Sequence, residues 1–155
     1  MYERIIWATD GSEGADAALA EVKKLAVEGG RIIAVHCVEF LTGRAMGLPT
    51  DPEEPEHAAR IREQIADLRA EGFDVSLVTH RVHTSPADTI SAVAEEEHAD
   101  LIVCGTRGMS ALAGALMGSV SQRLLHAAHV PVLVVPEPHP AVLVVETPKK
   151  EVAGV

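Results

Sequence analysis

The sequence predicts an α/β protein, an open parallel sheet with helices on both faces. Short apolar runs, rich in branched residues and too short for helices, alternate with segments whose apolar residues recur at helical spacing. The chain has 155 residues, and 47% are hydrophobic, which favours a single compact domain. Strands that alternate with helices pair in parallel, because each helix returns the chain to the same end of the sheet.

Five apolar runs are predicted as the strands. They span residues 4–9, 32–38, 73–82, 101–104 and 132–135. The third run alternates partly between apolar and polar residues, as expected of a strand near a sheet edge. Pro131 stands at the start of the fifth predicted strand, where proline is tolerated.

Helices are predicted between these runs. The first carries apolar residues at helical spacing from Ala15 to Ala26, and Gly29-Gly30 is predicted to stop it. The second runs from Ala58 to Leu68 and is closed by Gly72. Residues 40–55 contain three prolines and are predicted as a long loop.

Two further helices have recognisable starts. Ser85 is predicted to cap the third, with Pro86 in its first turn and Asp88 facing the exposed amides. Gly118-Ser119 opens the fourth.

Charge and composition exclude several classes of protein. Asp and Glu number 23 against 13 Lys and Arg, a formal net charge of −10, so nonspecific binding to nucleic acid or anionic membranes is disfavoured. Aromatic residues are only 3%, too few for the stacking surfaces of single-strand binders. Neither a bilayer-spanning apolar run nor an export signal is visible. Cys37 and Cys104 lie in apolar runs, which suits reduced, buried thiols, and we expect a cytoplasmic protein.

The segment from Gly105 to Ser119 is the strongest functional signal. It follows the fourth predicted strand, where parallel α/β sheets bind ligands at the carboxyl ends of their strands. Glycines let backbone amides approach a phosphate closely, and the helix that starts at Gly118-Ser119 presents its positive end. The Ser119 hydroxyl can also donate to a phosphate oxygen.

Acidic residues are missing from this part of the chain. No Asp or Glu occurs between Leu101 and Pro136, where Arg107 and Arg123 are the only full charges. The absence of carboxylates favours an anion site, because like charges repel. Deep burial of the same unit is the alternative explanation. Neither a Walker loop nor the G-x-G-x-x-G dinucleotide fingerprint is present.

The spacing of the glycines resembles the ATP-binding signature of the universal stress protein family. Gly105, Gly108, Gly118 and Ser119 match the pattern G-x2-G-x9-G-S. The likeness continues through residues 120–126 and 130–135, and at the other end it includes residues 5–12 and 35–38. It therefore covers about residues 3–136.

This resemblance implies an architecture and a ligand. It implies a Rossmann-like sheet of five parallel strands in the order 3-2-1-4-5, one bound ATP per subunit with Mg²⁺, and a homodimer through the fifth-strand edge. Residues 1–136 are expected to form the universal stress protein domain. Residues 137–155, which the resemblance does not cover, are expected to form a C-terminal tail. Its apolar segment 141–145 could pair beside the fifth strand, either in its own subunit or in a partner.

The resemblance also implies a set of binding residues. By position, the matched glycines and Ser119 would hold the ribose and phosphates, Asp10 would face the adenosine, and the backbone of Cys37 would meet the adenine edge. The remaining pocket residues implied are Ala8, Cys104, Thr106, Arg107 and Val120. Ala8 departs from the proline that ATP-binding relatives often carry, which puts the local turn shape in question.

Several residues have competing interpretations. Asp10 could contact a ribose hydroxyl or a metal, or it could cap the first helix through the amides near Ser12. Histidine pairs such as His126 and His129 lack a convergent thiolate or carboxylate, so no metal ligand is predicted. His36 is interpreted as a buried, hydrogen-bonded histidine. Arg44, in the long loop, is a candidate to close over a triphosphate.

The resulting hypothesis is an ATP-binding regulator or interaction module of the stress response, with no catalytic residue assigned. One alternative is a slow ATP hydrolase or phosphotransferase, for which Asp10 is the only candidate base. The other is a dimeric interaction protein that binds no nucleotide.

Overall fold

Five parallel strands form the sheet, in the spatial order β3-β2-β1-β4-β5. The structure is a computed structural model that describes residues 1–41, 47–106 and 117–137. The predicted fold class and strand order are confirmed. The strands are β1 (Tyr2–Ala8), β2 (Ala26–Glu39), β3 (Asp74–Val82), β4 (Leu101–Gly105) and β5 (Val132–Val135).

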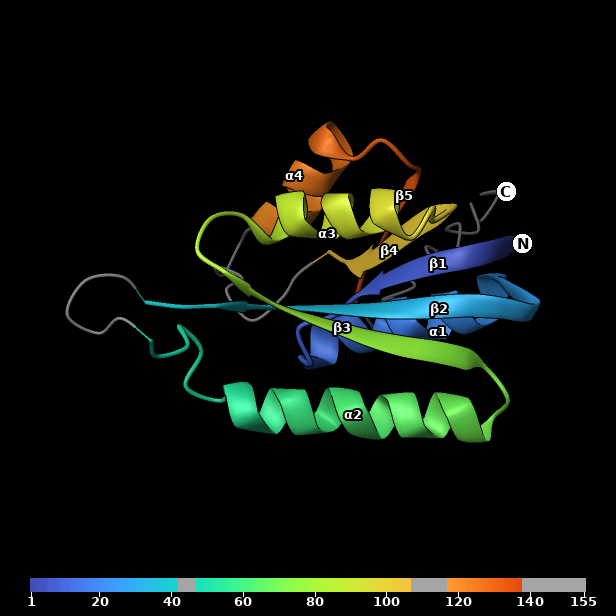
Figure 1. Ribbon diagram of the computed structural model, residues 1–155, viewed down its shortest axis with the longest axis horizontal. Helices are drawn as coiled ribbons and strands as arrows, with labels where there is room; N and C mark the ends of the chain where they lie inside the picture. Colours follow the sequence, from blue (N-terminus) through green and yellow to red (C-terminus); the bar gives the residue numbers. More distant parts are fainter. Residues whose placement is uncertain (42–46, 107–116, 138–155) are drawn as a thin grey trace, which may run out of the picture.

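Helices cover both faces of the sheet. Figure 1 shows α1 and α2 on one face and α3 and α4 on the other. Their bounds are α1 (Asp16–Leu25), preceded by the short 3₁₀ helix η1 (Glu13–Ala15), α2 (Glu54–Ala70), α3 (Pro86–Glu96) and α4 (Ser119–Ala127). Among the described residues, no helix has both the length and the apolar character needed to cross a membrane.

Successive side chains along each strand point to opposite faces of the sheet, which divides the core into two halves. Ile5 and Trp7 of β1 pack with the helices α1 and α2, whereas Ile6 and Ala8 pack with α3 and α4. Trp7 is the only tryptophan of the chain, and its side chain is fully buried. The central strands are therefore apolar on both faces, as a covered parallel sheet requires.

The first helix ends earlier than predicted. The prediction that Gly29-Gly30 stops this helix is wrong, because α1 ends at Leu25 and β2 begins at Ala26. The two glycines lie inside β2, where its pairing with β1 shifts register between Tyr2 and Arg4. Gly29 has a φ of +76°, which a strand irregularity tolerates best at glycine.

The start of the third helix also differs in detail. Ser85 occupies the N-cap position of α3, but its side chain makes no capping hydrogen bond. The Asp88 carboxylate is paired with Arg123 of α4.

Arg44 and segment 141–145 lie outside the described residues.

Candidate functional site

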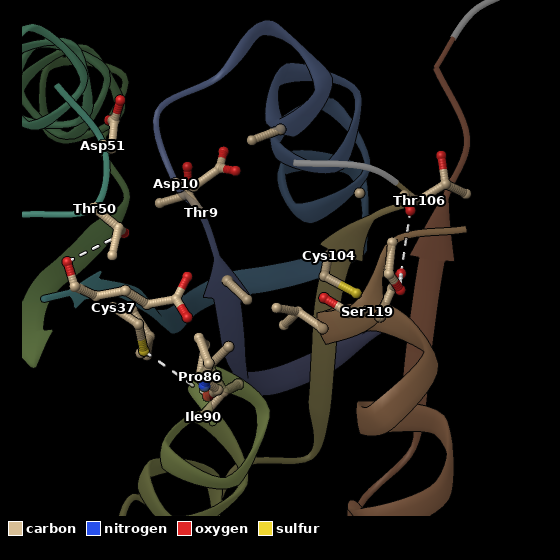
Figure 2. A pocket seen from close by; sticks show the side chains of 18 of the residues that line it. Thr9, Asp10, Cys37, Thr50, Asp51, Pro86, Ile90, Cys104, Thr106 and Ser119 are labelled. Carbon is tan, nitrogen blue, oxygen red and sulfur yellow. Dashed lines mark hydrogen bonds between the residues drawn. The ribbon is translucent and has the colours of Figure 1, made fainter. Parts of the chain in front are cut away.

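A cavity of about 380 Å³ opens at the carboxyl ends of β1, β2 and β4. We call it the site pocket. Figure 2 shows Thr50 and Asp51 on one side of it, Thr106 and Ser119 on the other, and Thr9 and Asp10 between them. Its lining residues are Ala8, Thr9, Asp10, Ala15, Val35, Cys37, Glu39, Thr50, Asp51, Pro52, Pro86, Ile90, Cys104, Gly105, Thr106, Gly118, Ser119, Val120 and Ser121.

The start of α4 forms one wall of the site pocket. Gly118 is the N-cap, with the extended φ and ψ of −72° and 159°. The amides of the first turn of a helix have no acceptor within that helix, so those of Ser119 and the next residues are donors at the pocket wall. The helix dipole adds positive potential at the same place. This wall is therefore suited to an anionic group.

Hydrogen bonds hold this wall to the end of β4. The carbonyl of Thr106 accepts from the Gly118 amide, 2.6 Å away, and from the Ser121 hydroxyl, 3.1 Å away. Ser121 Oγ also lies 2.9 Å from the carbonyl of Gly118. Ser121 is 3% exposed, so these contacts form in the protein interior.

The first turn of α3 forms the base of the site pocket. Pro86 and Ile90 line it, and the Cys37 sulfur lies 3.9 Å from the Pro86 carbonyl (Figure 2). Just beyond, the guanidinium of Arg123 donates two hydrogen bonds, of 2.9 and 2.8 Å, to the carboxylate of Asp88. The bond from Arg123 lowers the pKa of Asp88. This exposed pair links α3 to α4 beside the pocket.

The turn after β1 carries Asp10 into the site pocket. Asp10 Oδ1 accepts hydrogen bonds from the Ser12 amide at 3.0 Å and the Ser12 hydroxyl at 2.5 Å. This local contact is with Ser12, the N-cap residue of η1, and not with an amide of α1, whose N-cap is Ala15. Asp10 also lines the pocket. Gly11 has a φ of +77° and packs against the backbone of His57 in α2. Arg60 of α2 donates to the Gly11 carbonyl at 3.2 Å.

Residues that precede α2 form the wall opposite α4. The amide of Thr50 donates to the Glu39 carbonyl at 2.8 Å, which attaches this segment to the end of β2. The carboxylate of Asp51 lies 2.8 Å from Nδ1 of His57, and its other oxygen accepts from the Glu53 amide at 2.9 Å. These contacts place Thr50, Asp51 and Pro52 at the pocket.

Charge divides the site pocket into two halves. Asp10, Glu39 and Asp51 line the half formed by β1, β2 and the segment before α2. The described lining residues of β4 and α4 include no carboxylate. A ligand with an anionic end is therefore favoured with that end at α4 and with hydrogen-bond donors, such as hydroxyls, facing the acidic half.

Both cysteines line the site pocket with protonated thiols. Burial raises the pKa of Cys104 from 9.0 to about 11. Burial, with a smaller contribution from the Glu39 carboxylate, raises the pKa of Cys37 to about 11 as well. Thiols of this kind are poor nucleophiles at neutral pH. Among the described residues, no group of three or more His, Cys, Asp or Glu side chains is placed to hold a metal ion.

The structure brings nine of the eleven sequence-predicted site residues together at one pocket. They are Ala8, Asp10, Cys37, Cys104, Gly105, Thr106, Gly118, Ser119 and Val120. Arg107 and Gly108 lie outside the described residues. Their predicted contacts with a ligand stay predictions. His36 is buried and hydrogen-bonded, as its interpretation required.

Sequence reasoning missed several lining residues. Pro86 and Ile90 could have been found, because the Ser85-Pro86 helix start follows the carboxyl end of a predicted strand. Thr50, Asp51 and Pro52 carried no comparable signal. Their position depends on contacts with Glu39 and His57, which no local pattern reveals.

Comparison with known families identifies a match over most of the chain. The model of the universal stress protein family matches residues 1–136. The universal stress protein MJ0531 of Methanocaldococcus jannaschii is 32% identical over 145 residues, covering 89% of this chain and 84% of the relative. A universal stress protein of Thermus aquaticus is 36% identical over 140 residues, covering 87% and 99%.

Solved structures with the same fold include proteins with bound nucleotides. The structure of MJ0577, a Methanocaldococcus jannaschii protein, has a TM-score of 0.69 at 26% identity and covers 90% of this chain and 99% of its own. A universal stress protein in complex with cAMP has a TM-score of 0.61 at 27% identity, with coverage of 87% and 97%. One from Archaeoglobus fulgidus in complex with dAMP has a TM-score of 0.61 at 26%, with coverage of 86% and 98%.

Proposed function

The chain belongs to the universal stress protein family, and from this premise we propose that it binds ATP in the site pocket and acts as a nucleotide-sensing regulator or interaction module. The observation that carries the proposal is the α4 wall, where unpaired amides of a helix start face a pocket half without described carboxylates. Structural neighbours in complex with cAMP and dAMP support an adenine nucleotide as the ligand.

The charge division of the pocket suggests the orientation of the nucleotide. The phosphates lie at Gly118, Ser119 and Val120, with Gly105 and Thr106 beside them, because an anion is favoured there. The ribose hydroxyls face Asp10, which accepts hydrogen bonds. The adenine lies toward Cys37 and α3, where Pro86 and Ile90 provide apolar surface. Arg107 and Gly108 are proposed to contact the phosphates.

The residues present fit a nucleotide better than a resident metal. A cavity of about 380 Å³ is within the range of small-molecule sites, roughly 300–1,000 Å³. The described residues offer no ready-made group of metal ligands. Mg²⁺ is therefore proposed to arrive with ATP, held mainly by phosphate oxygens and water.

The proposal is tested by what the purified protein carries and what stabilises it. Acid release should yield copurified adenine nucleotide. A melting series with ATP and Mg²⁺ should show that the folded protein is stabilised by about 2.7 kcal/mol when the ATP concentration is 100 times the dissociation constant. A melting temperature unchanged by ATP, ADP, AMP and cAMP would contradict the proposal and favour an interaction protein without nucleotide. ADP formation during incubation with ATP would favour the slow hydrolase.

We also propose a cytoplasmic homodimer joined through β5, which lies at one end of the described sheet. An edge strand leaves backbone groups able to pair with another chain. Deletion of residues 137–155, the proposed C-terminal tail, should weaken association. Light scattering across a dilution series measures this, and an equal mass for the full and shortened chains would count against a role of the tail.

A further inference from the structure

A glutamate of β2 lies in the part of the site pocket where the nucleobase is proposed to bind. Val35, Cys37 and Glu39 all line the pocket. Alternate residues of a strand share one face of the sheet, so the Glu39 side chain projects on the same face as that of Cys37, nearer the end of the strand. Figure 2 shows Cys37 and Thr50 on the side of the pocket away from Ser119. Glu39 therefore lies away from the wall proposed for the phosphates.

Hydrogen bonds fix the backbone from which this side chain projects. The carbonyl of Glu39 accepts from the Thr50 amide at 2.8 Å and from the Thr50 hydroxyl at 3.3 Å. On its other side, Glu39 is in register with Val82 of β3, which is buried. The end of β2 is thus held between β3 and the segment before α2. The position of the Glu39 side chain at the pocket follows from these contacts.

The carboxylate of Glu39 is available to a ligand. Among the residues that the structure describes, none donates a hydrogen bond to this carboxylate or forms an ion pair with it. The carboxylates of Asp10 and Asp51, in the same acidic half, already accept hydrogen bonds from nearby amides. After burial, the charge of Glu39 is the second cause of the raised pKa of Cys37, which places the carboxylate near that thiol.

The hydrogen-bonding groups beside Cys37 are mainly acceptors. A carboxylate only accepts, and so does the carbonyl of Pro86, which lies 3.9 Å from the Cys37 sulfur. A nucleobase edge with N–H donors therefore fits this part of the pocket, whereas an edge with a carbonyl oxygen is repelled. Adenine has an amino group at position 6, with two N–H donors. Hypoxanthine has a carbonyl oxygen at the same position.

We propose that Glu39 determines the nucleobase specificity of the site pocket by accepting a hydrogen bond from the 6-amino group of adenine. The pocket then favours adenine over purines with no group, or with a carbonyl oxygen, at position 6. This inference rests on the proposed function, because it takes the nucleobase to lie toward Cys37. The backbone of Cys37 can contact the same edge, so the experiment has to separate the Glu39 side chain from that backbone.

Two nucleosides isolate the amino group. Adenosine and purine riboside differ only in the 6-amino group, and neither has a phosphate whose charge Glu39 would repel. The native chain should bind adenosine at least about tenfold more tightly, as expected for a hydrogen bond to a charged acceptor. Glu39→Ala leaves the backbone of Cys37 in place. It should reduce the preference to about threefold or less, the contribution of a hydrogen bond between neutral groups.

Glu39→Gln tests the same contact through inosine, the nucleoside of hypoxanthine. A glutamine amide both accepts and donates, so it can bond to the 6-amino group of adenosine or to the carbonyl oxygen of inosine. The native chain should bind inosine more weakly than purine riboside, because two oxygens then face each other. Glu39→Gln should bind inosine at least about tenfold more tightly than the native chain does. Inosine affinity equal in the two proteins would count against the proposed contact.

Calorimetry with the three nucleosides measures these affinities at a single pH. Glu56→Ala is the matched control, because Glu56 is an exposed acid of the first turn of α2 that does not line the pocket. It should keep the native preference for adenosine. Glu39 is also exposed, so the unliganded variants should melt close to the native chain.

The ratio of the affinities for adenosine and purine riboside decides the inference. The same ratio in the native chain and Glu39→Ala would overturn it, even if both affinities changed, and would leave nucleotide binding intact. No binding of adenosine or ATP by the native chain would instead contradict the proposed function, on which the inference rests.

Discussion

The amide of Gly118 donates a hydrogen bond of 2.6 Å to the carbonyl of Thr106, which joins the start of α4 to the end of β4. Ser121 donates to the same carbonyl from the first turn of the helix. The two ends of the intervening segment are thus held together at the site pocket. The direction in which the first amides of α4 point depends on these two bonds.

Substitution of Ser121 should loosen this junction. Ser121→Ala removes one donor to Thr106, so we expect a loss of about 1 kcal/mol in unfolding free energy. We also expect weaker binding of ATP with little change for adenosine, because the affected amides face the phosphates. Urea unfolding and calorimetry with the two ligands measure these effects.

Ser91→Ala is the matched control for that substitution. Ser91 is also buried, but its hydroxyl has no hydrogen-bond partner among the described residues. Its removal should be neutral or stabilising and should leave both affinities unchanged. Equal losses of ATP and adenosine affinity in Ser121→Ala would show that Ser121 acts on the whole pocket and not on the phosphate half.

Gly11 should be intolerant of any side chain. Its φ is +77°, and a Cβ there would lie 2.6 Å from the carbonyl oxygen of His57. Gly29 has almost the same φ, +76°, with nothing within 4 Å of its Cβ position. Gly29→Ala should therefore cost about 1 kcal/mol for the backbone conformation alone. Gly11→Ala should cost an additional 1–3 kcal/mol or so, as overpacking does.

Trp7 provides the measurement for these two variants. It is the only tryptophan, fully buried, and two residues before Thr9, so its fluorescence reports unfolding of the central strand. Equal midpoints for Gly11→Ala and Gly29→Ala in urea would show that α2 does not pack against the Asp10 turn as described.

Alkylation of the cysteines should be slow and strongly dependent on pH. With a pKa of about 11, only about one thiol in 10⁴ is ionised at pH 7. The rate should rise about tenfold per pH unit until the pH approaches that pKa, because the thiolate is the nucleophile. Both cysteines line the pocket, so ATP should slow the reaction further.

Iodoacetamide labelling followed by mass spectrometry measures this at each cysteine. Both should react fully in denaturant, which provides the reference rate. Rapid labelling of folded protein at neutral pH, at either Cys37 or Cys104, would contradict the burial that raises the pKa of these thiols.

Local patterns located all five strands and the glycine-rich half of the pocket, although β2, Ala26–Glu39, is longer than the predicted run 32–38. The apolar run Val132–Val135 is β5 to the residue, and Gly118-Ser119 does open a helix at the pocket. These features depend on neighbours in sequence, namely apolar periodicity and the residues that begin a helix.

Features that depend on contacts between residues far apart in the sequence could not be predicted from such local patterns. The end of α1 at Leu25 depends on how β2 pairs with β1, where Gly29 accommodates a register shift instead of ending the helix. His36 was interpreted as a buried histidine, but its partner Glu54 is 18 residues away, inside the region predicted as a loop. Asp51, in the acidic half of the pocket, was missed for the same reason, whereas Asp10 in that half was predicted.

Titration of ATP into two variants of Gly118 tests the central claim, that phosphates lie at the start of α4. Gly118 has the extended backbone of an N-cap, a position that Asp and Asn occupy equally well. Gly118→Asp and Gly118→Asn should therefore have similar stability and differ only in a negative charge at the proposed phosphates. Asp should weaken ATP binding at least about tenfold relative to Asn, equivalent to about 1.4 kcal/mol, with adenosine much less affected. Equal ATP affinity in the two variants would contradict this placement of the phosphates.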